Sequence, residues 1–147
     1  MEHTIFMRKG AKRSFIEACT AFYIKQLKLD KSKYKLLIVT KKGLSKTESM
    51  SGLATELPDK NLVVFLDSGL SWEKMLTTLA HEMVHVKQMA TGKLKYKTIK
   101  GNTYAYWNGK RVVKDYTERP WEHQAWSQEL ILANRLMAVF NTDIKKF

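Results

Sequence analysis

The sequence predicts an α+β fold, in which a small mixed or antiparallel sheet of about three strands packs on an N-terminal helix and a central helix. A β-hairpin and a C-terminal helix complete the predicted order. Three long segments with apolar residues every three or four positions predict the helices, and short β-branched runs predict the strands. Because 147 residues is near the common size of one domain, we expect residues 1–147 to form a single domain.

The N-terminal half contains the first helix and the three strands. Apolar side chains recur at helical spacing from Lys12 to about Lys28, which predicts an amphipathic helix. An apolar, β-branched run at 34–40 and a weaker alternation at 51–57 predict two strands. A turn at Pro58 then precedes a third strand at 62–66.

The C-terminal half contains two further helices and the hairpin. Ser71 is a suitable N-cap for the central helix, and Gly92 is a suitable stop. The dipeptide Asn108-Gly109 lies between aromatic and β-branched residues, so residues 103–113 are predicted to form a β-hairpin with a tight turn. Residues 117–140 show helical spacing after a threonine cap and a proline in the first turn, which predicts the last helix.

The chain is strongly basic, with 26 Lys and Arg against 14 Asp and Glu, a net charge of +12 and a pI near 9.8. This surplus favours weak association with nucleic acid, although a solvated, lysine-rich exterior is the simpler interpretation. No apolar run approaches the roughly 20 residues of a membrane span, and no secretory signal is recognisable. We therefore expect a cytoplasmic protein (in the host cytoplasm if a phage encodes it), monomeric and without a membrane partner. The lone Cys19 is expected to be a core residue.

The central helix contains the pattern H-E-x-x-H at His81, Glu82 and His85. Histidines four residues apart lie one turn apart on a helix, so both imidazoles can bind one Zn²⁺ ion. Glu82 lies beside this pair, where its carboxylate can act as a general base on a water at the metal. The alternative is that the histidines are solvated or hydrogen-bonded core residues. The apolar neighbours of the pair favour the metal site, because buried histidines need partners.

Two histidines leave a catalytic zinc ion one protein ligand short of the usual three. The C-terminal helix offers Glu122 and His123 in its first turn. Glu122 is the favoured ligand, because Ala125 follows on the same helical face and lets the two helices approach closely. His123 remains the alternative donor.

The motif His81-Glu82-Met83-Val84-His85, the strand before it, the hairpin after it and the later segment "RPWEHQA" together resemble the zincin metallopeptidases. The resemblance is to the small gluzincin-type domains of bacteria and phages, which have a glutamate as third ligand, and it covers residues 62–133. It implies a zinc-dependent endopeptidase of protein or peptide substrates, with one Zn²⁺ held by His81, His85 and Glu122 and with Glu82 as the base. It also implies that the strand before the motif helix lies at the sheet edge, where an extended peptide can pair with it.

A zinc peptidase also needs a donor that stabilises the oxyanion. Five side chains are candidates for this role or for contacts with the substrate, although aromatic packing or a surface charge is the simpler explanation of each: Tyr104, Tyr106, Tyr116, Arg119 and His123.

A different class of function remains open, namely a basic nucleic-acid-associated protein. It is either a binding module with a structural or vestigial metal site or, by analogy, a SprT-like protease that acts near DNA. The free Glu82 favours the peptidase, because a closed structural zinc site needs no base.

Overall fold

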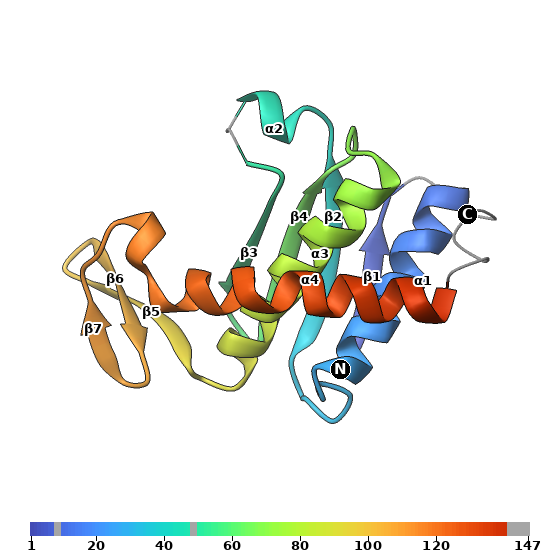
Figure 1. Cartoon of the computed structure of the whole chain (residues 1–147). Coiled ribbons are helices and arrows are strands. Elements are labelled where there is room, and N and C mark those ends of the chain that lie inside the picture. Colours follow the sequence, from blue (N-terminus) through green and yellow to red (C-terminus); the bar gives the residue numbers. More distant parts are fainter. Residues whose placement is uncertain (8–9, 48–49, 141–147) are drawn as a thin grey trace.

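The computed structural model describes residues 1–7, 10–47 and 50–140. Figure 1 shows the order of the elements along the chain. The strands are β1 (Glu2–Phe6), β2 (Lys35–Lys41), β3 (Gly52–Leu57), β4 (Asn61–Asp67), β5 (Leu94–Ile99), β6 (Asn102–Trp107) and β7 (Lys110–Val112). The helices are α1 (Ala11–Gln26), α2 (Leu44–Thr47), α3 (Trp72–Ala90) and α4 (Pro120–Phe140), with a short 3-10 helix, η1 (Tyr116–Glu118). The predicted α+β class is confirmed, as are the three long helices.

The main sheet is mixed and has four strands in the order β1-β2-β4-β3. β1, β2 and β4 are parallel, and β3 is antiparallel to β4. The expectation that the strand before the motif helix lies at the edge is wrong, because β4 lies between β2 and β3. The physical reason is visible in its composition: Leu62, Val63 and Val64 form a continuous apolar run that is buried on both faces, as is typical of an inner strand.

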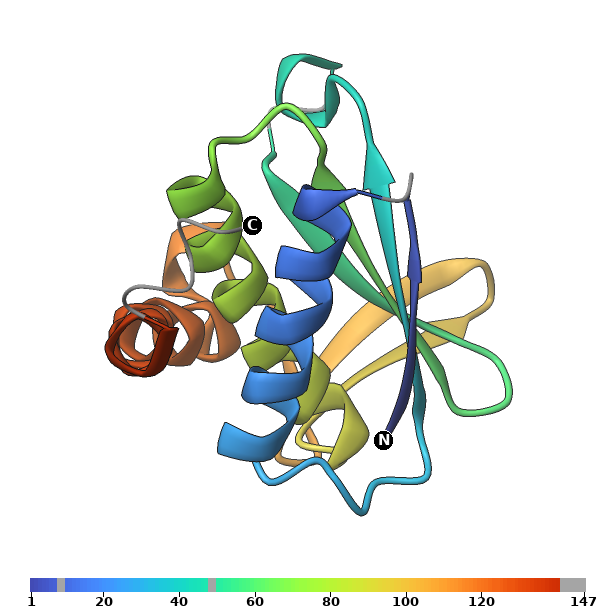
Figure 2. The ribbon, with the colours of Figure 1, turned by 90° about the vertical axis from the view of Figure 1, so that its right-hand side faces the viewer.

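Helices α1 and α3 cover one face of this sheet, and α4 packs on the far side of α3 (Figure 2). The core lies between the sheet and helices α1 and α3, where Leu36, Ile38, Val64 and Met83 are fully buried. Sequence analysis missed β1, in which only Ile5 is buried, and β5, in which only Leu94 is buried. Their apolar patterns are therefore too weak to predict a strand.

A second, antiparallel sheet consists of β5, β6 and β7 and extends away from the main sheet at the N-terminal end of α4 (Figure 1). β6 and β7 form the predicted hairpin, and both turn residues have the positive φ that a tight turn requires, 50° at Asn108 and 82° at Gly109. Leu94 and Trp107 on one face of this sheet pack against the core. Among the described residues, no helix is both long and apolar enough to cross a membrane.

Candidate metal centre

Helix α3 presents the H-E-x-x-H pattern from its middle turns. The helix begins as predicted, because the Ser71 hydroxyl accepts a hydrogen bond from the backbone N–H of Lys74 at 3.2 Å. Apolar residues at helical spacing fix the rotation of α3 against the sheet and α4. As a result Glu82 and His85 are buried, and His81 is partly buried where α3 faces α4.

Helix α4 brings Glu122 to the two histidines. Pro120 begins this helix, where its missing N–H costs no hydrogen bond. Ala125 is fully buried and Ala133 is 4% exposed, and these small side chains let α4 lie close along α3. The predicted close approach of the two helices is therefore present.

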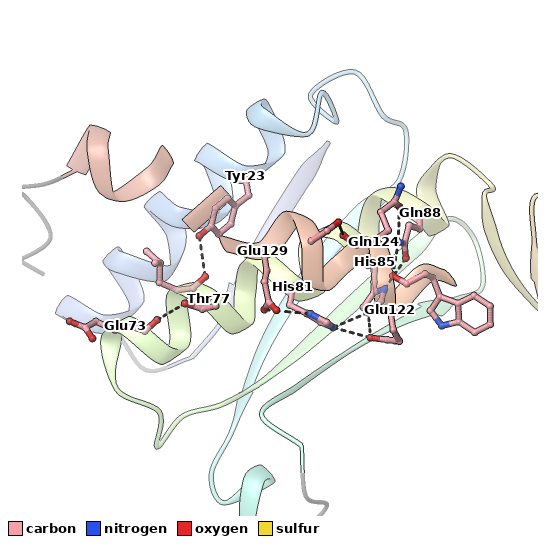
Figure 3. Close-up of polar contacts among 12 residues, drawn as sticks. Tyr23, Glu73, Thr77, His81, His85, Gln88, Glu122, Gln124 and Glu129 are labelled. Atoms are coloured by element: carbon pink, nitrogen blue, oxygen red, sulfur yellow. Dashed lines mark hydrogen bonds and ion pairs between the residues drawn. The ribbon is translucent and has the colours of Figure 1, made fainter. Parts of the chain in front are cut away.

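The three predicted ligands meet in a compact triangle (Figure 3). Nε2 of His81 lies 3.0 Å from Oε1 of Glu122, Nε2 of His85 lies 3.2 Å from the same oxygen, and the two Nε2 atoms are 3.2 Å apart. A tetrahedral zinc ion with ligand distances of 2.0–2.1 Å separates its ligands by roughly 3.3–3.4 Å. The triangle thus has almost the edge length that such an ion requires, and the three side chains could hold a metal ion.

Polar neighbours fix the orientation of both imidazoles. Nδ1 of His85 donates a hydrogen bond of 2.8 Å to Oε1 of Gln88, whose amide group donates to the Trp121 carbonyl and to Gln124. These two donated bonds assign the amide oxygen of Gln88, so Nδ1 of His85 carries the proton and its Nε2 offers a lone pair to the site.

Glu129 occupies the equivalent position beside the other histidine. A carboxylate oxygen of Glu129 lies 3.6 Å from Nδ1 of His81, on the opposite side of the ring from Glu122 (Figure 3). A carboxylate in that place favours the Nδ1–H tautomer and leaves Nε2 of His81 free to bind a cation.

The surroundings of Glu122 and Glu82 shift the pKa values of these two carboxyl groups in opposite directions. Burial alone would raise the pKa of Glu122, but hydrogen bonds from the protonated imidazoles of His81 and His85, whose Nε2 protons a bound cation would replace, lower it to about 2. Burial raises the pKa of Glu82, although the two histidines oppose this. Glu122 is therefore held as a carboxylate, while Glu82 is a stronger base than an exposed glutamate.

Close packing of β3 on α3 places Glu82. A Cβ atom on Gly52 would lie 2.9 Å from Cγ2 of Thr78 and 3.1 Å from Cγ of Glu82, so only glycine fits there without displacing α3 side chains. Glu82 is 5% exposed and lies beside the histidine pair instead of within the triangle. This is the arrangement predicted for a residue that contacts the site without acting as a ligand.

A cleft of about 940 Å³ opens over the triangle and is lined by residues of β3, α3, β5, η1 and α4. Tyr116 and Arg119, two of the predicted oxyanion candidates, line it. Burial, the nearby charge of Glu122 and a hydrogen bond to that carboxylate raise the pKa of Tyr116 to about 12, so its phenol keeps its proton at neutral pH. Both residues are therefore placed to donate into the cleft.

The remaining candidates lie outside the cleft. His123 donates to the Thr117 carbonyl at 2.7 Å and its ring packs on Trp126, because the first turn of α4 directs it away from Glu122. This excludes the alternative in which His123 completes the triangle. Tyr104 and Tyr106 do not line the cleft either, because they lie on the opposite face of the second sheet from Leu94 and Tyr96, which do line it.

Sequence reasoning missed Gln88, Glu129 and Gly52. Gln88 follows His85 by three residues and Glu129 follows Glu122 by seven, so helical spacing alone places each on the same face as the ligand before it. Gly52 gave no such signal, because its role depends on the packing of β3 against α3.

The chain matches no protein-family model, no curated protein and no solved structure. Its site is therefore interpreted from its own geometry.

Proposed function

We propose that this protein is a zinc-dependent endopeptidase, with His81, His85 and Glu122 as metal ligands and Glu82 as the general base. The observation that carries the proposal is the triangle of donor atoms 3.0–3.2 Å apart with a buried, unligated carboxylate beside it. Two imidazoles and one carboxylate suit Zn²⁺, and three protein ligands leave a position open for water and substrate.

The open ligand set supports a catalytic role over a structural one. Structural zinc sites are closed by four protein ligands, frequently cysteines, and the only cysteine of this chain is buried elsewhere, in α1. The orientation of both histidines by Gln88 and Glu129 is the support that a metal-binding imidazole requires. These features also support kinship with the gluzincin-type zincins.

Each residue then has a definite task. A bound zinc ion would lower the pKa of a water and polarise the scissile carbonyl. Glu82, whose pKa is raised by burial, accepts the proton of the attacking water and delivers it to the departing amine. The phenol of Tyr116 and the guanidinium of Arg119 donate hydrogen bonds to the developing oxyanion.

The edge of the main sheet supports a peptide as the substrate. β3 is an edge strand, and Gly52, Leu53 and Ala54 line the cleft above the triangle. An extended peptide can pair its backbone with β3 and thereby cross the cleft with a carbonyl near the metal. The edge strand is thus β3 in place of the strand that the resemblance implied.

The experiment measures bound zinc and cleavage of an unstructured protein for the wild type, Glu82→Gln and Glu122→Ala. Glu82→Gln should retain zinc and lose cleavage by about 100-fold or more, because only the base is removed. Glu122→Ala should lose zinc and cleavage together. The control is His123→Ala, which alters the neighbour of Glu122 outside the cleft and should retain both.

Two outcomes would contradict the proposal. Wild-type protein that contains no stoichiometric zinc after purification without chelator would exclude the metal site. Cleavage by Glu82→Gln at the wild-type rate would exclude Glu82 as the base.

A further inference from the structure

The second sheet has an outward face that takes no part in the cleft. Directly opposed residues of an antiparallel pair share one face, and β5 pairs Lys95 with Tyr106 and Lys97 with Tyr104, while β7 pairs Arg111 with Tyr106. We call these five residues the cationic face. Leu94 and Trp107 point the other way, toward the core, so the cationic face is directed to solvent.

Cations and aromatic rings are interleaved on this face. Nζ of Lys97 lies 4.7 Å from the ring centre of Tyr106, and the Arg111 guanidinium lies 3.9 Å from that of Tyr104. The two tyrosines are half-buried, whereas the three cations are exposed. Lys95 and Lys97 are two residues apart on β5, so their Cα atoms are separated by roughly 6.8 Å along the strand.

The charged side chains of residues 93–114, the segment that contains the second sheet, are all positive. Residues 93–114 contain seven basic residues and no Asp or Glu. They are Lys93, Lys95, Lys97, Lys100, Lys110, Arg111 and Lys114. Among the residues that the structure describes, none of these seven forms an ion pair. Their charges are thus available to an anionic partner.

We propose that the cationic face binds single-stranded nucleic acid. Exposed cations neutralise the phosphates, and the tyrosine rings provide surfaces on which bases can stack. An acidic polypeptide would use the cations but has no bases for the tyrosines. A duplex would offer phosphates but keeps its bases stacked on one another. This binding is independent of the metal centre and does not rest on the proposed peptidase activity.

The experiment uses the full chain and a fluorescent oligothymidylate of about 20 nucleotides, titrated at several salt concentrations. The experiment replaces the three cations (Lys95→Gln, Lys97→Gln, Arg111→Gln). The negative slope of log K against log salt should become less steep by about two, because three phosphate contacts are lost. Tyr104→Leu with Tyr106→Leu should weaken binding roughly tenfold or more while leaving that slope unchanged.

A matched control removes three charges elsewhere, in Lys25→Gln, Lys31→Gln and Lys33→Gln, which lie at the end of α1 and in the loop after it. This variant should bind nearly as the wild type does, and circular dichroism confirms the fold of every variant. Several outcomes would overturn the proposal: no binding at low salt, an equal loss in the control, undiminished binding after loss of the tyrosines, or tighter binding of duplex DNA or polyglutamate.

Discussion

The candidate metal centre and the cationic face differ in how their charged side chains are held. In the metal centre His81, His85, Glu122 and Glu82 are at most 14% exposed. A hydrogen bond to Gln88 orients the imidazole of His85, and the carboxylate of Glu129 orients that of His81. On the cationic face Lys95, Lys97 and Arg111 are exposed, and Lys97 and Arg111 lie over the rings of Tyr106 and Tyr104. The first region is organised before a ligand arrives, and the second can adapt to its ligand.

The two regions also have opposite charge. Glu82, Glu122 and Glu129, three of the 14 acidic residues, gather at the metal centre of a chain whose net charge is +12. The net charge therefore describes the surface and says nothing about the site. The charges favour a cation in the buried region and an anion on the exposed face, so we expect no competition between the proposed ligands of the two regions.

Among the effects expected to differ between the two regions, the largest is the stabilisation of the folded protein by zinc. A metal that binds the folded state alone stabilises it by about 2.7 kcal/mol at a free concentration 100 times its Kd. Thermal unfolding of wild-type protein should therefore shift upward with zinc and return with a chelator. Glu122→Ala, which lacks one corner of the triangle, should show little of this shift.

The cation triple variant Lys95→Gln, Lys97→Gln, Arg111→Gln is the control, since its metal centre is intact. It should respond to zinc as the wild type does. A zinc response in Glu122→Ala equal to that of the wild type would show that the ion binds elsewhere.

Helical periodicity explains how much of the site could be predicted. His81, His85 and Glu122 lie on two long helices whose apolar faces are evident in the sequence, and Ala125 on α4 indicated the close approach. Cap and turn chemistry similarly predicted the start at Ser71 and the hairpin at Asn108-Gly109. In each case the signal is local, because it depends on residues within one or two turns.

Features that depend on pairing between distant strands could not be predicted in this way. The position of β4 inside the sheet results from its pairing with β2 on one side and β3 on the other, which no local pattern specifies. β1, whose five residues bury only Ile5, adds a further strand beside β2. The role of Gly52 likewise arises from contact with Thr78 and Glu82, which lie 26 and 30 residues later in the chain. The identity of zinc and the peptidase activity stay predictions.

The substitution Gly52→Ala tests whether the packing of β3 on α3 positions Glu82, and we expect its effect to be of intermediate size. The added Cβ would lie 2.9 Å from Cγ2 of Thr78 and 3.1 Å from Cγ of Glu82, so α3 side chains must move. Overpacking of this kind costs about 1–3 kcal/mol in the free energy of unfolding. Cleavage should fall by about tenfold or more because Glu82 is displaced, while zinc content should be retained.

Thr78→Ser in the same chain removes the Cγ2 atom and should restore part of the stability and the cleavage. Leu57→Ala is a matched control, since this side chain of the same strand is 44% exposed and does not line the cleft. If Gly52→Ala cleaves as the wild type does, the contact between β3 and Glu82 does not position the base.

The smallest effect is expected for the stability of the cationic face. Lys97→Gln removes an exposed ammonium 4.7 Å from the Tyr106 ring, an interaction that contributes about 0.5 kcal/mol at exposed sites. Chemical denaturation should therefore show a change in the free energy of unfolding of about 0.5 kcal/mol or less, and no change in zinc content. A loss as large as that of Gly52→Ala would mean that Lys97 is part of a fixed structure. The face would then be organised before binding, as the metal centre is, and the difference between the two regions would lie in their charge alone.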